Sequence, residues 1–77
     1  MKATQILTAV SQSLDTPNEW KNIHGEYILS ETFIDTYTNG KYNVRLIQKG
    51  NKATLYDILN IKAEKEVNLL IDQRKGL

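Results

Sequence analysis

The chain contains no cysteine, and it has only one proline and one tryptophan. Without cysteine, neither a disulfide framework nor a thiolate zinc site can stabilise the fold. We expect the 77 residues to form a single domain, 1–77, and a chain of this length buries only about 60% of the surface that its unfolded form exposes. Packing of a small core or self-association must therefore supply the stability.

Long apolar runs are also absent. The polar residues Thr4, Gln5, Thr8 and Ser11 interrupt the stretch that a signal peptide would need. No other stretch approaches the length of a membrane span. Together with the lack of cysteine, this pattern predicts a cytoplasmic protein with no membrane partner.

Residues that usually carry catalysis are scarce. His24 is the only histidine, so a catalytic triad or an imidazole metal site would depend on one side chain. The four glycines are isolated and form no phosphate-binding loop. The carboxylates form no evident acid–base pair. The sequence therefore predicts a protein that is not an enzyme, with no cofactor, no metal site and no small-molecule substrate.

Charge is distributed unevenly along the chain. Residues 1–38 carry two basic and five acidic side chains, whereas residues 39–77 carry eight basic and four acidic ones. Such a separation can steer an anionic partner, and in a short chain it can also mark a solvated face. The abundance of isoleucine, asparagine, lysine and tyrosine is typical of AT-rich coding, which on composition alone favours a phage or another mobile element as the source.

Two helices are expected in the first third of the chain. Apolar residues recur at helical spacing over residues 3–14, which predicts an amphipathic helix. The sequence Thr16-Pro17-Asn18-Glu19 matches a capping box with proline at the first helical position, so a short second helix is expected to follow, continuing to about Ile23 and ending at Gly25. Trp20 and Ile23 would pin this short helix against the first one or the sheet edge.

The central part of the chain has the pattern of β-strands. Residues 32–38 are rich in β-branched and aromatic residues, and Asn39-Gly40 predicts a hairpin with a type I′ turn. A second turn at Gly50-Asn51 leads to a strand over residues 52–59, which places Leu55 beside Leu46. The first hairpin would pair Tyr37 with Tyr42, Asp35 with Val44, Phe33 with Leu46 and Glu31 with Gln48.

Asp35 conflicts with the apolar side of this sheet. Either a β-bulge turns its carboxylate outward, or the register differs there, or the acid is paired with a base such as a lysine of a helix; we favour the bulge. A helix over residues 61–75, with Asn60 as its N-cap, completes the expected fold. The fold class is thus α+β, in the order α-α-β-β-β-α, with a three-stranded antiparallel sheet covered by helices on one face.

The face of the sheet that no helix covers is the candidate site. By the expected registers it displays five residues suited to a protein partner: Ile34, Arg45, Ile47, Tyr56 and Ile58. The first hypothesis is a small protein-binding regulator, inhibitor or adaptor that docks through this face or an edge strand, with another protein or with itself as a homodimer.

The alternative is a nucleic-acid-binding module. Basic side chains would contact phosphates and a tyrosine would stack on a base, as in sheet-surface modules that bind single strands. The residues assigned to this role are Lys41, Arg45, Lys49, Lys52 and Tyr56.

Overall fold

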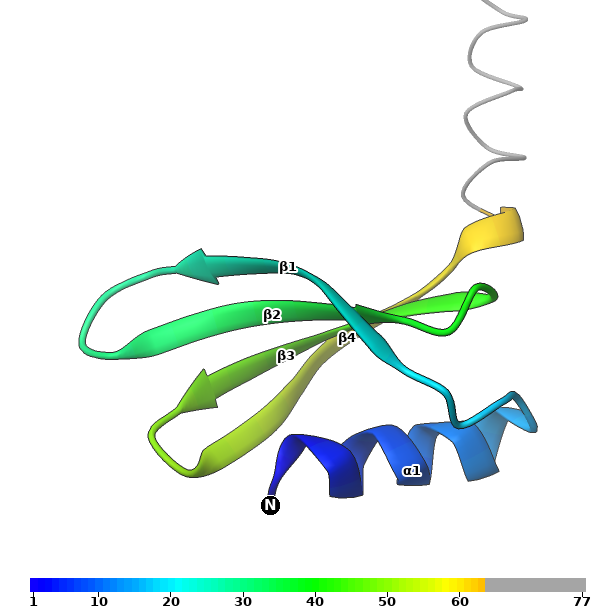
Figure 1. Cartoon of the computed structure of the whole chain (residues 1–77), viewed down its shortest axis with the longest axis horizontal. Coiled ribbons are helices and arrows are strands. Elements are labelled where there is room, and N and C mark those ends of the chain that lie inside the picture. The colour runs from blue at the N-terminus through cyan, green and yellow to red at the C-terminus, as the bar shows by residue number, and fades with distance from the viewer. Residues whose placement is uncertain (64–77) are drawn as a thin grey trace, which may run out of the picture.

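A computed structural model describes residues 1–63 and shows one helix beside a four-stranded antiparallel sheet (Figure 1). Helix α1 spans Ala3–Leu14, and the strands are β1 (Lys21–Tyr27), β2 (Thr32–Thr38), β3 (Tyr42–Lys49) and β4 (Lys52–Asn60). The strand order is β1-β2-β3-β4, so each strand pairs with its neighbour in sequence. The predicted α+β class, the N-terminal helix and the antiparallel sheet are confirmed, and the predicted number of three strands is wrong.

An extended connection and β1 occupy the residues predicted to form a second helix. The amide nitrogen Nδ2 of Asn39 donates to Oγ1 of Thr16 and to the carbonyl of Pro17, both at 2.9 Å. From Lys21 onward the backbone pairs with β2. The prediction of a helix to Ile23 is wrong because these long-range contacts outweigh a local capping signal.

Trp20 anchors the connection to α1. Its indole N–H donates to Oγ of Ser11 at 2.8 Å, and that hydroxyl donates to the carbonyl of Leu7 at 2.9 Å. Ser11 is buried although it is polar, so its hydroxyl needs both partners. The expected role of Trp20 as a pin against the first helix is therefore confirmed, without the short helix that was expected to carry it. Ile23 does not share this role, because it is 50% exposed.

The hairpin between β2 and β3 turns one residue later than predicted. The loop consists of Gly40 and Lys41, because the N–H of Asn39 donates to the carbonyl of Tyr42. Gly40 has a φ of 90°, and glycine at the first loop position is typical of a type II′ turn. Tyr37 therefore lies opposite Val44. This two-residue change in register leaves every side chain on its predicted face.

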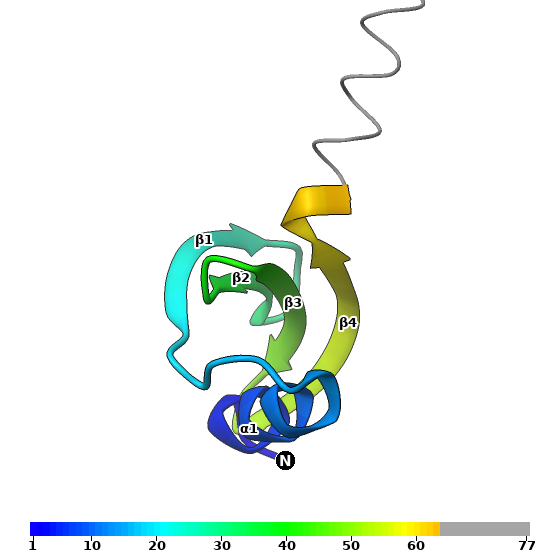
Figure 2. The same cartoon turned by 90° about the vertical axis from the view of Figure 1, so that its right-hand side faces the viewer.

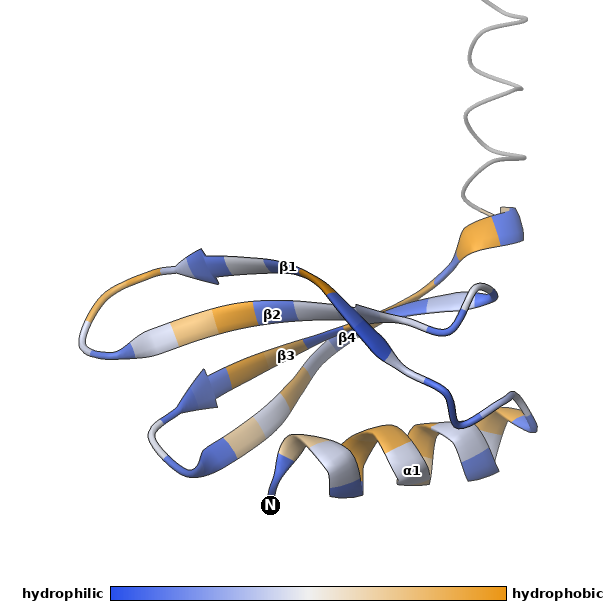
Figure 3. Cartoon of the chain, in the orientation of Figure 1, coloured by the Kyte–Doolittle hydropathy of each residue, from blue (hydrophilic) through white to orange (hydrophobic). Residues whose placement is uncertain are grey.

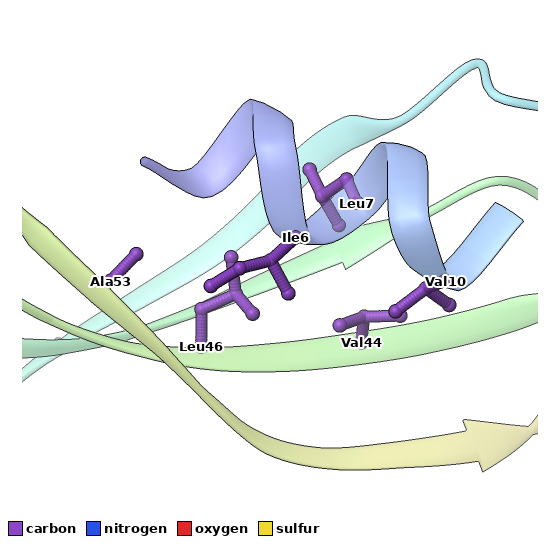
Figure 4. Packing of buried hydrophobic residues seen from close by; sticks show 6 residues of the cluster. All are labelled: Ile6, Leu7, Val10, Val44, Leu46 and Ala53. Carbon is purple, nitrogen blue, oxygen red and sulfur yellow. The ribbon is translucent and has the colours of Figure 1, made fainter. Parts of the chain in front are cut away.

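The core lies between α1 and one face of β3 and β4 (Figure 2). Val44 and Leu46 of β3 have no solvent exposure. The close view in Figure 4 shows the side chains of α1 above these two residues. The full set of buried apolar residues is Ile6, Leu7, Val10, Val44, Leu46 and Ala53.

Asp35 lies on the same side of the sheet as the core, and no bulge turns it outward. It pairs with Leu46 on one side and with Gly25 on the other. Its Oδ2 accepts a hydrogen bond from Nε2 of Gln48 at 2.6 Å. A Cβ at position 25 would lie 2.9 Å from Oδ1 of Asp35. The expected bulge in β2 is wrong because glycine in β1, rather than a helix cap, gives the carboxylate room.

Residues 61–63 take helical backbone after β4. Oδ1 of Asn60 accepts a hydrogen bond from the N–H of Ala63 at 3.0 Å, which is the contact of an N-cap. The predicted role of Asn60 is therefore confirmed. The rest of the predicted C-terminal helix lies outside the described residues.

Replacing Ser11 by alanine tests the anchor on α1. The Ser11→Ala variant leaves the Trp20 N–H without its acceptor, and we expect a loss of about 1–3 kcal/mol in the free energy of unfolding. Because the chain has one tryptophan, its fluorescence emission should also move toward that of solvated indole. Urea unfolding followed by fluorescence measures both effects. Ser13→Ala, at an exposed position of the same helix, is the control, and equal losses in the two variants would contradict the role of Ser11.

Candidate interaction surface

The open face is the side of the sheet opposite α1. Since Val44 and Leu46 of β3 point toward the helix, the alternating residues Arg45 and Ile47 point away from it. Ile34 of β2 lies directly opposite Ile47, and both side chains are partly buried. The structure thus places three of the predicted partner-binding residues on this face.

A β-bulge in β4 changes the predicted facing of its second half. Arg45 pairs with Asp57 and Leu46 pairs with Leu55, so Tyr56 is the extra residue. The Arg45 guanidinium lies 4.8 Å from the centroid of the Tyr56 ring and hydrogen-bonds to Asp57. Tyr56 and Asp57 therefore both lie on the open face.

Ile58 falls on the opposite side of β4 from its predicted place. It pairs with Val44 and lines an apolar groove with residues of α1. The bulge adds one residue and so reverses the alternation that follows it. The prediction that Ile58 belongs to the open face is wrong for this reason.

Arg45 forms an ion pair with Asp57. Its Nε donates to Oδ1 of Asp57 at 2.7 Å, and its Nη2 donates to Oδ2, which makes the contact bidentate. The hydrogen bond to Arg45 holds the pKa of Asp57 below its usual value, and the reciprocal bond raises the pKa of Arg45. Arg45 is therefore already neutralised by an acid of its own chain.

The remaining basic residues of the nucleic-acid alternative are far apart. Lys41 lies in the loop between β2 and β3, whereas Lys49 and Lys52 pair with each other where β3 meets β4. These two sites lie at opposite ends of β3, which at about 3.3 Å per residue separates them by roughly 25 Å. The structure does not bring the predicted basic residues into one patch.

Strand β4, at one edge of the sheet, exposes four large apolar side chains. Its exposed large apolar residues are Leu55, Tyr56, Ile58 and Leu59. Figure 3 shows apolar residues along β4 and on the neighbouring helix. Leu55 and Ile58 form one wall of the groove, and residues of α1, among them Ile6, Val10 and Leu14, form the other.

The two edges of the sheet differ in their protection. β1 has a register shift between Asn22 and His24, contains Gly25, and carries charged side chains such as Glu26. Bulges and charges discourage pairing at an edge. β4 also has a bulge, at Tyr56, but it exposes four large apolar side chains, whereas β1 exposes two, Ile23 and Tyr27. β4 is nine residues long, and within residues 1–63 its outer edge is met by one backbone hydrogen bond, from the Ala53 N–H to the Met1 carbonyl at 2.8 Å.

Neither a metal cluster nor a membrane-spanning helix within residues 1–63, nor a related protein, points to another kind of site. Among residues 1–63, no group of three or more His, Cys, Asp or Glu is placed to hold a metal ion. No helix in this part of the chain has the length and apolarity to cross a membrane. No family model, curated protein or solved structure matches the chain.

Sequence reasoning missed Asp57, Leu55 and Leu59 as members of the surface. The signal lies in β4 itself, where apolar residues occur at 55, 56, 58 and 59 rather than at every second position. A break in alternation of this kind indicates a bulge. The acid that follows Tyr56 is then directed toward the arginine in the middle of β3.

The pH dependence of stability tests the ion pair. Because the folded-state pKa of Asp57 is lowered, its contribution is present at pH values above about 4 and is lost as the pH falls through the folded-state value. We therefore expect Asp57→Asn to be less stable than the natural chain at about pH 6, and the difference to shrink at about pH 2. Urea unfolding at both pH values measures it. A difference that stays constant with pH would show that the carboxylate charge plays no part.

Proposed function

We propose that the chain is a small, non-enzymatic protein-binding module, a regulator, inhibitor or adaptor, whose docking surface is the β4 edge with the side chains on both sides of it. The observation that supports this proposal is the exposure of four large apolar residues on one edge strand, whose outer edge is met within residues 1–63 by a single backbone hydrogen bond, to Met1. Exposed edges recruit a further strand through their free backbone groups, and flanking apolar side chains supply the favourable burial.

The residues on the two faces of β4 have separate roles in this proposal. Leu55 and Ile58 present an apolar groove on the helix side. On the open side, Tyr56 is held against Arg45, which limits its rotamers before a partner arrives. An aromatic ring and an arginine in a fixed arrangement are typical of residues that contribute most to binding energy at interfaces.

The nucleic-acid alternative has less support from the geometry. A phosphate would have to compete with the bidentate Asp57 for Arg45. Glu26 adds a further negative charge whose field reaches Arg45. Binding of a polyanion depends on several uncompensated basic groups along one track.

Photo-crosslinking at Tyr56 tests the docking surface. A benzophenone amino acid at position 56 should form a covalent adduct of defined mass with a polypeptide when the chain is expressed and irradiated in cells. The matched control is position 27 of β1, because Tyr27 is 61% exposed and Tyr56 is 51% exposed. Equal labelling from both positions, or none from position 56, would contradict docking on β4.

Fluorescence anisotropy with labelled single- and double-stranded DNA and RNA separates the two functions. The protein-binding proposal expects no binding at about 50 mM salt. Binding that weakens steeply between about 50 and 200 mM salt would favour the nucleic-acid alternative. In that case Arg45→Glu with Lys49→Glu should abolish it, whereas Tyr56→Ala would leave the salt dependence in place.

A further inference from the structure

We propose that the partner on the β4 edge is a second copy of this chain, with the two β4 strands antiparallel about a two-fold axis that passes between Tyr56 and Asp57. This inference rests on the proposed function, since it names the partner of the same surface. It would join two four-stranded sheets into one continuous sheet.

In β4, the residues whose backbone N–H and C=O groups point away from β3 are placed symmetrically about the middle of the strand. The Ala53 N–H points outward, toward Met1, so Leu55 two residues later also presents its N–H and C=O outward. At the other end the Ile61 N–H donates to the carbonyl of Lys41 at 3.1 Å, so residue 61 directs its backbone groups inward, toward the β3 side. Asn60 and Ile58 therefore present their groups outward.

The bulge makes this pattern symmetric. A regular strand would direct every second residue outward, but the extra residue at Tyr56 shifts the sequence of outward residues from 55 directly to 58. A two-fold axis between Tyr56 and Asp57 brings Leu55 of one copy opposite Ile58 of the other. Each of these two equivalent pairs can exchange two N–H···O bonds. The ladder between the copies is limited to this central part, because the Ala53 N–H, which would face Asn60 of the other copy, is bonded to Met1.

Side-chain facing is matched in the same register. Leu55 and Ile58 both lie on the helix side of β4, so their pairing joins the apolar grooves of the two copies. On the open side, Thr54 of one copy lies opposite Leu59 of the other. In a register shifted by one residue, a side chain from the helix side of one copy would lie opposite a side chain from the open side of the other, and this match would be lost.

Charge does not oppose pairing in this register. Asp57 of the second copy comes opposite Tyr56, the ring over which Arg45 lies at 4.8 Å. The two intrachain ion pairs between Arg45 and Asp57 therefore lie on either side of the axis, each with its charge compensated within its own copy. In the neighbouring register with Asp57 opposite Asp57, two carboxylates would face each other, which is unfavourable.

Cysteine pairing across the axis tests this register, and the chain has no cysteine to interfere. Thr54→Cys in one sample and Leu59→Cys in another are mixed in a glutathione redox buffer. Opposite residues have Cβ atoms about 5 Å apart, within reach of a disulfide. Two copies of the same variant place their thiols roughly 16 Å apart along the strands, which is too far.

The expected result is a covalent dimer in the mixture and little in either variant alone. Leu29→Cys mixed with Thr54→Cys is the control, since Leu29 is 63% exposed and lies in the loop between β1 and β2. Sedimentation equilibrium of the full natural chain should give the dimer mass. Crosslinking of the control mixture to the same extent would overturn the register.

A monomer at concentrations up to about 0.5 mM, with no crosslink in the mixture, would overturn the second copy as the partner. An adduct between position 56 and a different polypeptide would then leave the proposed function in place. A monomer in which Leu55 and Ile58 show nuclear Overhauser effects to Val67 or Leu70 would instead assign the groove to the chain's own C-terminal segment, and would also overturn the proposal.

Discussion

Everything in this fold depends on the contact between α1 and the middle of β3. Val44 and Leu46 are the largest side chains that are fully buried among the described residues, and three apolar residues of α1 cover them. Burial of a side chain of this size contributes about 1.5–3 kcal/mol. With so few such residues, the contact leaves a narrow margin for stability. The hydrogen bond from Trp20 to Ser11 matters because it holds the chain after the helix in the place that keeps α1 on the sheet.

The bulge in β4 determines which side chains of this strand face the helix and which face the open side of the sheet. By adding Tyr56 it leaves Leu55 and Ile58 on the helix side while both Tyr56 and Asp57 turn to the open face. The same residue therefore gives Arg45 its ion pair and its aromatic neighbour. A β4 without the extra residue would carry Asp57 toward the apolar groove and Ile58 toward solvent. One insertion in the ladder thus determines both the charge of the open face and the symmetry of the edge.

The sequence predicted those features that depend on local spacing. The helix over residues 3–14, the β2 range, the pairing of Leu55 with Leu46 and the cap at Asn60 all follow from periodicity and turn chemistry. Features that depend on distant partners were not predictable in this way. Thr16 forms a contact with Asn39 instead of capping a helix, and Asp35 is accommodated because glycine lies opposite it in β1. The predicted register of the β2–β3 hairpin was wrong by two residues. Because two is an even number, the side chains were still assigned to the correct faces of the sheet.

The strand order has a consequence for how the chain folds. Because β1 to β4 pair only with sequence neighbours, each hairpin can close through a short loop soon after its two strands have been synthesised. Docking of α1 is different, since Val10 must close a long loop to reach Val44, at a cost of about 3 kcal/mol in chain entropy. The hairpins are therefore expected to form before α1 docks, and the core of the described residues is complete only when α1 packs against β3 and β4.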